Sequence, residues 1–343
     1  MKYLLIFLFI FLSLFAFRIY SIGGIHNYPS FQPSDNSVLL LNLRTTLQNK
    51  VIDHLPSPQA ELLSGMLLGV KSALPPDFKL ALTNTSTIHV VVVSGQNLTL
   101  VAGFFISLAP LIGRKKAIII SLFAIVFYLL LTGFQAPSIR AAIMVGLASL
   151  AQLFGKNRES PWILFLTGGA MLLWNPNWLV SISFQLSFLA TFGVIVVAPL
   201  LIKYLNFLPE IIKQDLSISI ATQALTWPII ALNFHQISLV GVITNTLVLW
   251  TVPFIMISGA AAISATFLNS FIAQLLFIAP NSFLTYFVYV INFFNQWGSV
   301  KINNFPSLIL IGYYLLFAGL FWMLKQKSQE PPLDIARLSS SQP

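Results

Sequence analysis

The sequence predicts an all-α polytopic membrane protein with about ten transmembrane helices. Of its 343 residues, 57% are hydrophobic and 8% are charged, whereas soluble domains carry roughly 25% charged residues. Apolar runs long enough to cross a bilayer recur almost to the C-terminus, as expected for helical spans. No alternation of polar and apolar residues persists long enough to indicate an outer-membrane β-barrel.

The N-terminal residues predict an anchor and a short outside segment. The first apolar run lies between Lys2 and Arg18 and has no clear small-residue cleavage site, so we expect residues 1–19 to form a retained membrane anchor. Residues 20–57 are polar and contain prolines, which favours a short extracytoplasmic segment. The apolar stretch at residues 60–70 is too short to span and predicts an interfacial or re-entrant helix.

The remaining spans follow from the spacing of the apolar runs. They are predicted at residues 87–112, 117–134, 138–154, 161–175, 178–201, 216–232, 237–262, 268–293 and 306–324. They belong to a multi-span domain over residues 58–325. The last residues, 326–343, carry Pro, Ser and charge, and they predict a disordered cytoplasmic tail.

The basic residues indicate how the chain is oriented. They gather in short loops, at Arg114, Lys115 and Lys116, at Lys156 and Arg158, at Lys203 and Lys213, and at Lys325 and Lys327. Lys and Arg are retained on the cytoplasmic side of a membrane, so all of these loops are predicted inside and both termini are cytoplasmic. The formal charge of +9 is thereby explained by topology and does not by itself indicate nucleic-acid binding.

Several kinds of chemistry lack their residues. The chain has no cysteine, which excludes disulfides, thiolate metal ligands and cysteine nucleophiles. No predicted span contains a carboxylate, and the four histidines lack the spacing of metal ligands. Ser94 follows valines, whereas a serine nucleophile sits in a glycine-flanked turn. We therefore expect no enzyme activity, no metal and no other cofactor.

A polar interruption divides the apolar stretch that starts at His89. It consists of Ser94, Gly95, Gln96 and Asn97. Hydrocarbon offers no partner to polar side chains or to loosened backbone, so such a break requires surrounding protein or a wet cavity. We therefore expect a broken or re-entrant helix near residues 89–100, beside a passage or a binding site.

Other polar residues recur within the apolar spans. Arg140 lies one turn inside a span, where it either extends to the outer headgroups or faces the bundle interior and meets an anion. Pro228 frees a backbone carbonyl in its span and so requires a kink or a polar neighbour. The others are Gln185, Ser187, Gln223 and Asn245. Their side chains either join helices by hydrogen bonds or line a wet path.

In this order, the features resemble the integral-membrane competence domain of the ComEC family. Its His and Ser-Gly-x-His element matches residues 89–97, with Asn97 where histidine is common. Its Arg-Ala-x-x-Met matches residues 140–144, and its Asn-Pro turn and Phe-Gln-Leu-Ser-Phe match residues 175–176 and 184–188. Its later pattern matches Gln223, Pro228, Phe234-His235-Gln236-Ile237-Ser238 and Asn245. The similarity covers about residues 58–260.

The resemblance implies a channel in the bacterial plasma (inner) membrane that imports single-stranded DNA during natural transformation. It implies as partners the lipid bilayer, a DNA receptor, a cytoplasmic helicase or translocase, and a separate nuclease. Family members also contain an OB-like domain and a metallo-β-lactamase-like domain. We expect neither in this chain, because residues 20–57 and the tail are short, and no histidine cluster supports nuclease activity.

The candidate lumen residues are His89, Ser94, Gly95, Gln96, Asn97, Arg140, Gln185, Ser187, Gln223, Pro228 and Asn245. Unwound backbone at Ser94 and Gly95 offers N–H groups to a phosphate. Two alternatives remain open from the residues alone. The chain transports another anionic solute or a lipid-linked precursor, or it is a structural subunit whose polar residues only join helices.

Overall fold

The computed structural model describes residues 2–22, 38–70, 74–91, 95–134, 136–153, 160–205, 207–301 and 306–327. Some expectations fall outside these residues, namely those on Ser94, on part of the segment 20–57 and on most of the tail. The described chain is helical apart from two short strands.

The helices and strands follow one another in three parts of the chain. The first part contains α1 (Lys2–Ile22), α2 (Val38–Ile52), α3 (Gln59–Leu68), α4 (Pro76–Asn84), α5 (Ile88–Val91), α6 (Gly95–Ser107), α7 (Ala109–Ile112) and α8 (Arg114–Thr132). The middle contains α9 (Ala136–Leu153), α10 (Ser160–Trp174), the 3-10 helix η2 (Pro176–Val180), α11 (Ile182–Phe192), the π-helical turn η3 (Gly193–Val197) and α12 (Ala198–Tyr204). The last part contains α13 (Glu210–Phe234), β1 (Gln236–Ser238), α14 (Gly241–Val248), α15 (Thr251–Ala265), α16 (Ser270–Asn295), β2 (Ser299–Lys301) and α17 (Ser307–Lys327).

Several helices are long and apolar enough to cross a membrane. The described residues contain six of them, at Gly95–Ile112, Arg114–Thr132, Ala136–Leu153, Ile182–Tyr204, Ile212–Phe234 and Ser270–Asn295. The pair α14 and α15, bent by 43°, makes a seventh if it is one span. Shorter apolar helices occupy the three other predicted positions, at Phe11–Ser21, Ser160–Trp174 and Ile309–Met323. The fold is that of a helical multi-pass membrane protein, and the count of about ten spans stays a prediction.

One predicted span lies partly outside the described residues. Residues 88–91 form the short helix α5, and the apolar helix described next covers Gly95–Ile112. The described parts of the span predicted at 87–112 are thus helical, and the break predicted near residues 89–100 stays a prediction.

A large hydrophobic core occupies one half of the molecule. It joins residues of α2 to α6 and α8 with residues of α14 to α16, and we refer to it as the large core. Helix α3 lies at its centre, with Leu62, Leu63 and Met66 fully buried. The position of this helix relative to the membrane, interfacial or re-entrant, stays a prediction. Within the protein its apolar residues are buried against the helices that surround it.

The other half contains a much smaller core. Val197 and Ala198 pack there against Ala221 and Leu225 of α13, with aromatic residues of α17 around them. We refer to this cluster as the small core. The helices around it expose most of their apolar surface, as lipid-facing helices do.

Helix α17 supplies the polar neighbour that Pro228 requires. Pro228 lies inside α13, which continues from Glu210 to Phe234. Its ring leaves the Ala224 carbonyl without an intrahelical partner. The Tyr313 hydroxyl donates to this carbonyl at 2.7 Å, and the Tyr314 hydroxyl donates to the Leu225 carbonyl at 2.7 Å. The proline therefore fixes where α17 docks on α13.

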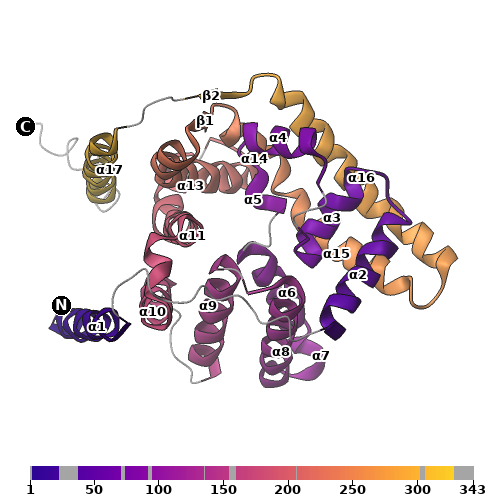
Figure 1. Cartoon of the computed structure of the whole chain (residues 1–343), viewed down its shortest axis with the longest axis horizontal. Coiled ribbons are helices and arrows are strands. Elements are labelled where there is room, and N and C mark those ends of the chain that lie inside the picture. Colours follow the sequence, from indigo (N-terminus) through magenta and orange to yellow (C-terminus); the bar gives the residue numbers. More distant parts are fainter. Residues whose placement is uncertain are drawn as a thin grey trace, which may run out of the picture.

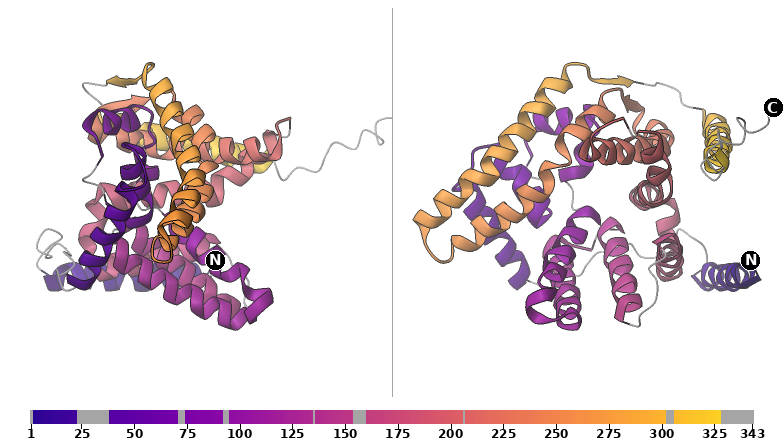
Figure 2. Two further views of the ribbon diagram at one scale, coloured as in Figure 1. Left: turned by 90° about the vertical axis from the view of Figure 1, so that its right-hand side faces the viewer. Right: turned by 180° about the vertical axis from the view of Figure 1, so that it is seen from behind.

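The two short strands bring together two distant parts of the chain. β1 follows α13 and pairs antiparallel with β2, which follows α16, with Gln236 opposite Lys301. Figure 1 shows this pair at the upper edge of the molecule. In the sequence, α14, α15 and α16 lie between the two strands. The two outermost helices, α1 and α17, lie on one side of the molecule in Figures 1 and 2.

Candidate functional site

The first polar junction joins three helices around Arg140. Its guanidinium Nη1 donates to the Ser187 hydroxyl at 2.6 Å and also to the Ser187 carbonyl. A Cβ added to Gly95 would overlap the Arg140 side chain, so α6 begins directly against it. The α9 residue Arg140 thus connects the start of α6 with α11. We refer to Gly95, Arg140 and Ser187 as the arginine junction.

Arg140 is a buried cation without a carboxylate. Its side chain is 7% exposed, and its Nε has no hydrogen-bond partner among the described residues. Among the described residues, Lys213 Nζ and Glu210 Oε2 form an ion pair at 2.7 Å, and Arg140 forms none. In the described structure, Arg140 thus has no carboxylate to neutralise its charge, although its guanidinium carbon lies 6.0 Å from the centre of the Phe188 ring.

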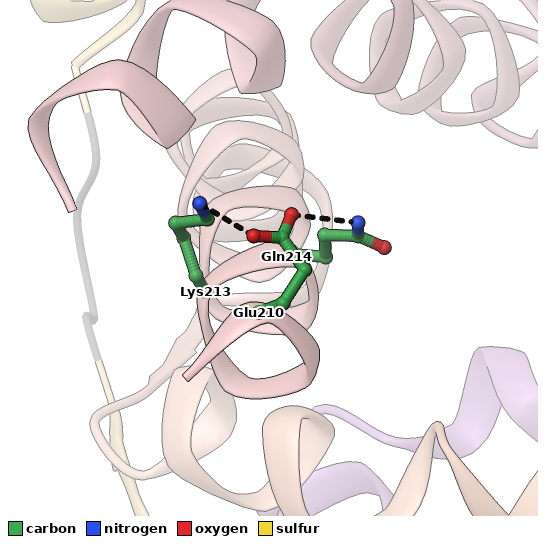
Figure 3. A network of polar contacts seen from close by, with 3 residues as sticks. All are labelled: Glu210, Lys213 and Gln214. Carbon is green, nitrogen blue, oxygen red and sulfur yellow. Dashed lines mark hydrogen bonds and ion pairs between the residues drawn. The ribbon is translucent and has the colours of Figure 1, made fainter. Parts of the chain in front are cut away.

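The Lys213–Glu210 pair is a surface feature at the start of α13. Figure 3 shows Lys213 and Gln214 both donating to the Glu210 carboxylate, with Gln214 Nε2 at 3.0 Å. The hydrogen bond from Lys213, and after it that from Gln214, lowers the pKa of Glu210 from its ordinary value. Close to this pair lies a carboxylate within a candidate span, because the apolar helix Ile212–Phe234 includes Asp215. The expectation that no span contains a carboxylate is therefore corrected.

The second polar junction joins α13, α14 and the turn before α5. A Cβ on Gly241 would lie 3.0 Å from Gln223 Nε2 and 2.9 Å from the Ser86 Cβ, so these residues meet closely. Ser86 has a positive φ of 57°, and His89 hydrogen-bonds its backbone. Asn245 follows Gly241 by one helical turn and lies on the same face. We refer to Ser86, Gln223, Gly241 and Asn245 as the amide junction.

The amide junction also contains unpartnered buried atoms. Gln223 Oε1 accepts a hydrogen bond from Trp227 Nε1 at 3.1 Å, but Gln223 Nε2 has no partner among the described residues. Asn245 is 4% exposed, and its Oδ1 has none in that part of the chain either. Buried amides are normally satisfied by protein or water, and each exception requires an explanation.

The two junctions lie where the two halves of the molecule meet. Helices α6 and α14 contribute to the large core, whereas α13 contributes to the small one. Figure 1 shows the elements that carry the junctions, α5, α6, α9, α11, α13 and α14, following one another around the middle of the view. We refer to the two junctions together as the polar seam.

Other sequence candidates lie outside the polar seam. Asn97 is 1% exposed and donates to the Met66 carbonyl at 3.0 Å, inside the large core. Gln185 donates to the Leu179 carbonyl at 2.9 Å and so fastens the adjoining turn. Gln96 is exposed on α6, and Pro228 serves the contact with α17 described above.

Sequence reasoning missed three contributors, namely Ser86, Gly241 and Tyr313. The Thr85-Ser86-Thr87 run before the polar break was a usable signal for the first, because such residues favour turns. Gly241 has no distinctive local pattern, since its importance comes from a contact with distant residues. No group of three or more potential metal ligands occurs among the residues that the structure describes.

Comparison with known proteins decides the family. A family model described as Competence protein matches residues 66–327. The chain belongs to the Competence protein family. The match runs from Met66 in α3 to the end of α17, so it includes both junctions, the small core and the part of the large core that follows residue 65. The resemblance drawn from the sequence motifs is confirmed.

Three relatives show the extent of the similarity. ComE operon protein 3 of Bacillus subtilis strain 168 is 27% identical over 245 residues, which are 71% of this chain and 31% of that protein. An uncharacterized protein of Aquifex aeolicus strain VF5 is 35% identical over 128 residues, or 37% of this chain and 30% of that protein. The uncharacterized protein YcaI of Escherichia coli K12 is 28% identical over 236 residues, or 63% of this chain and 29% of that protein.

The chain therefore spans about a third of the length of these relatives. No solved structure matches it.

Proposed function

We propose that this chain forms the conduit through which single-stranded DNA crosses the bacterial inner membrane, with both chain termini in the cytoplasm. The observation that carries the proposal is the buried Arg140, which has no carboxylate partner in the described structure and lies against the start of α6. The family description and the name of the Bacillus subtilis relative support a role in competence, the uptake of DNA.

The arginine junction has the electrostatics of a phosphate contact. The Arg140 guanidinium is buried next to Gly95, and its Nε has no hydrogen-bond partner among the described residues. A phosphate oxygen beside this guanidinium would gain a charge-assisted hydrogen bond from it. DNA supplies one such phosphate per nucleotide.

The amide junction suits passage rather than capture. Gln223 and Asn245 offer uncharged donors and acceptors that remain unpartnered in the described structure. A conduit requires contacts that are strong enough for entry and weak enough for release. One buried arginine with several amides and hydroxyls meets this requirement better than a dense row of lysines.

The partners of the conduit are part of the proposal. A DNA receptor on the outside, a helicase or translocase that pulls from the cytoplasm, and a separate nuclease fit a chain whose described residues contain no metal-binding group. The broken or re-entrant helix near residues 89–100 is also part of the proposal, and its described parts are α5 and the beginning of α6.

Deletion of the gene tests the proposal. We expect cytoplasmic uptake of labelled DNA to be lost and to return when the full chain is expressed. Uptake that persists in the deletion strain rejects the conduit. Accumulation of a small anionic solute or of a lipid-linked precursor would instead support the alternative transporter.

A matched pair of serine variants tests where the strand passes, since the chain contains no other thiol. Ser187→Cys places a thiol in the arginine junction, and Ser121→Cys places one in the fully buried interior of α8. We expect a small thiol reagent to modify the first variant and DNA in transit to protect it, whereas the second stays unmodified in both states. Equal modification with and without DNA contradicts a path beside Ser187.

A further inference from the structure

We propose that the hairpin of α15 and α16 lies along the outer surface of the membrane and does not cross it. Its exposed apolar face is inserted into the outer lipid leaflet. The proposal rests on the fold and holds whatever the cargo of the protein is. It concerns helices whose length and hydropathy alone qualify them as spans.

The segment 50–84 follows α16 from one end to the other. Lys50 Nζ donates to the Thr266 carbonyl at 3.2 Å, just before α16 begins. The ring of His54 stacks on Phe277 at 4.7 Å. At the far end of the helix, Asn84 Nδ2 donates to Asn295 Oδ1 at 2.9 Å. Any depth that α16 crosses is therefore crossed by residues 50–84 as well.

That segment carries charge along its whole course. Its charged residues are Lys50, Asp53, Glu61, Lys71, Asp77 and Lys79. Helix α16 has 26 residues, about 39 Å at 1.5 Å per residue, which exceeds the ~30 Å hydrocarbon core. If α16 crossed the bilayer, these charges would be spread through hydrocarbon, at about 2.5–3.5 kcal/mol for each one near the centre. At the membrane surface the exposed side chains of Asp53, Asp77 and Lys79 remain in water, whereas one carboxylate oxygen of Glu61 is buried inside the protein.

The contact between Lys50 and Thr266 also decides the topology. Residues 20–57 follow a single span from a cytoplasmic N-terminus and are expected outside, whereas ten spans put the turn between α15 and α16 inside. The two residues are in contact, so both expectations cannot hold if α16 crosses. A surface hairpin places Lys50, Thr266 and Asn84 on the outer side together.

Removing this hairpin from the spans leaves the rest of the topology intact. The remaining crossings among the described residues are then eight, at α1, α6–α7, α8, α9, α10, α11–α12, α13 and α17. An even number still brings the C-terminus to the cytoplasm and keeps every basic loop inside. The strands β1 and β2, which lie before α14 and after α16, then pair on the outer side.

The surface of α16 has two faces besides its buried one. Ser270, Gln274, Asn281, Thr285 and Asn292 form an exposed or half-exposed polar stripe with helical spacing. Beside this stripe lie exposed apolar residues, namely Phe271, Leu275, Ile278, Tyr289 and Phe293. A helix lying in the interface has this pattern, because one face meets water and the other meets acyl chains.

The direction of α16 agrees with a surface position. Figure 1 shows α15 and α16 along their length, whereas α1 and α17 are seen nearly end-on. In the left view of Figure 2, α16 stands upright and the helices around α8 run across it. Helices α14 to α16 contain no charged residue, so the apolar face has acyl chains rather than a charged partner as its natural occupant.

Single cysteines at the two ends of α16 test the proposal in spheroplasts that express the full chain. Ser270→Cys and Asn292→Cys both lie on the polar stripe, and Lys115→Cys, in the first turn of α8 on its predicted cytoplasmic side, is the inside control. We expect a membrane-impermeant maleimide to label both α16 variants in intact spheroplasts, and Lys115→Cys only after permeabilisation. Any result in which Ser270→Cys is not labelled in intact spheroplasts overturns the proposal.

A spin label on Phe271→Cys, in liposomes, tests the occupant of the apolar face. We expect this site to be more accessible to oxygen and less accessible to a water-soluble nickel complex than a label on Ser270→Cys. Equal accessibility of the two sites to the nickel complex shows that the face meets water or protein, and it overturns the assignment to lipid.

Discussion

The large core and the polar seam differ in which polar groups they satisfy. Both contain buried atoms without a partner in the described structure, and in the large core these include the Ser64 and Ser121 hydroxyls on α3 and α8. In the large core, the Met66 carbonyl accepts hydrogen bonds from Asn97 and Tyr128, at 3.0 and 2.9 Å. In the seam, Arg140 Nε, Gln223 Nε2 and Asn245 Oδ1 are buried without a partner in the described structure. Buried polar groups that are left unpaired cost stability, so they persist where they serve another purpose.

The difference separates scaffold from candidate site. Polar side chains in the large core complete its packing and fix α3 against α6 and α8. Those in the seam lie between halves that share few buried apolar residues, and they keep bonding capacity for a ligand. Variants on the two sides should therefore separate stability from transport.

Arg140→Gln should give the largest effect. It removes the charge and the hydrogen bonds to Ser187, and bonds to charged groups contribute about 1.5–3 kcal/mol each. We expect DNA import to fall by at least about tenfold, with Arg140→Lys retaining part of it because the charge remains. The measurement is cytoplasmic uptake of labelled DNA, normalised to the amount of protein in the membrane. Unchanged import by Arg140→Gln would remove the basis for an anion contact.

Gly95→Ala should give the next largest effect, because its methyl group overlaps the Arg140 side chain. Overpacking typically costs about 1–3 kcal/mol. Gly103→Ala lies on the same helix and meets nothing within 4 Å, so it is the matched control. Thermal unfolding in detergent should show a lower Tm for the first variant alone. Similar Tm values for both variants would contradict this prediction and would mean that the end of the Arg140 side chain moves aside at little cost.

Gln223→Leu and Asn97→Ala should diverge. The first replaces a buried amide that is only partly satisfied, so we expect stability to be kept and import to decrease. The second leaves the Met66 carbonyl with one donor fewer, so we expect a loss of about 1 kcal/mol in stability and normal import per folded molecule. The checks are Tm and normalised uptake. The same response in both variants would erase the distinction between seam and core.

The smallest effect should come from the exposed pair on α13, which belongs to neither region. Lys213→Met removes the main cause of the lowered pKa of Glu210, so that pKa should rise toward its ordinary value. A lowered pKa gives stability that is present above the unfolded pKa and is lost as pH falls through the folded one. NMR titration of the carboxylate checks the shift. If the pKa of Glu210 does not change in Lys213→Met, the hydrogen bond from Gln214 is what lowers it.

Hydropathy identifies most of this fold because each membrane helix must be apolar along its length, and it identified Arg140 because a charge in such a run is rare. It does not distinguish α16 from a span. Residues 241–295 contain no Lys or Arg, so the charge rule is silent there, and the orienting contacts come from the distant segment 50–84.

The site was only partly predictable for the same reason. Gln223 and Asn97 are both amides in apolar sequence, yet one lies in the seam and the other completes the core. Only tertiary contacts separate them. Gly241 matters through its approach to Ser86 and Gln223, which no local pattern indicates.

The ladder of β1 and β2 has a consequence for how this architecture can change. The pairing holds the end of α13 close to the segment that leads into α17. Because β1 and β2 pair with each other, the segment between them can be lengthened, shortened or exchanged without reversing the direction of α13 and α17. The region between the strands is thus a replaceable insert, and hybrids that swap it between relatives should keep their membrane orientation.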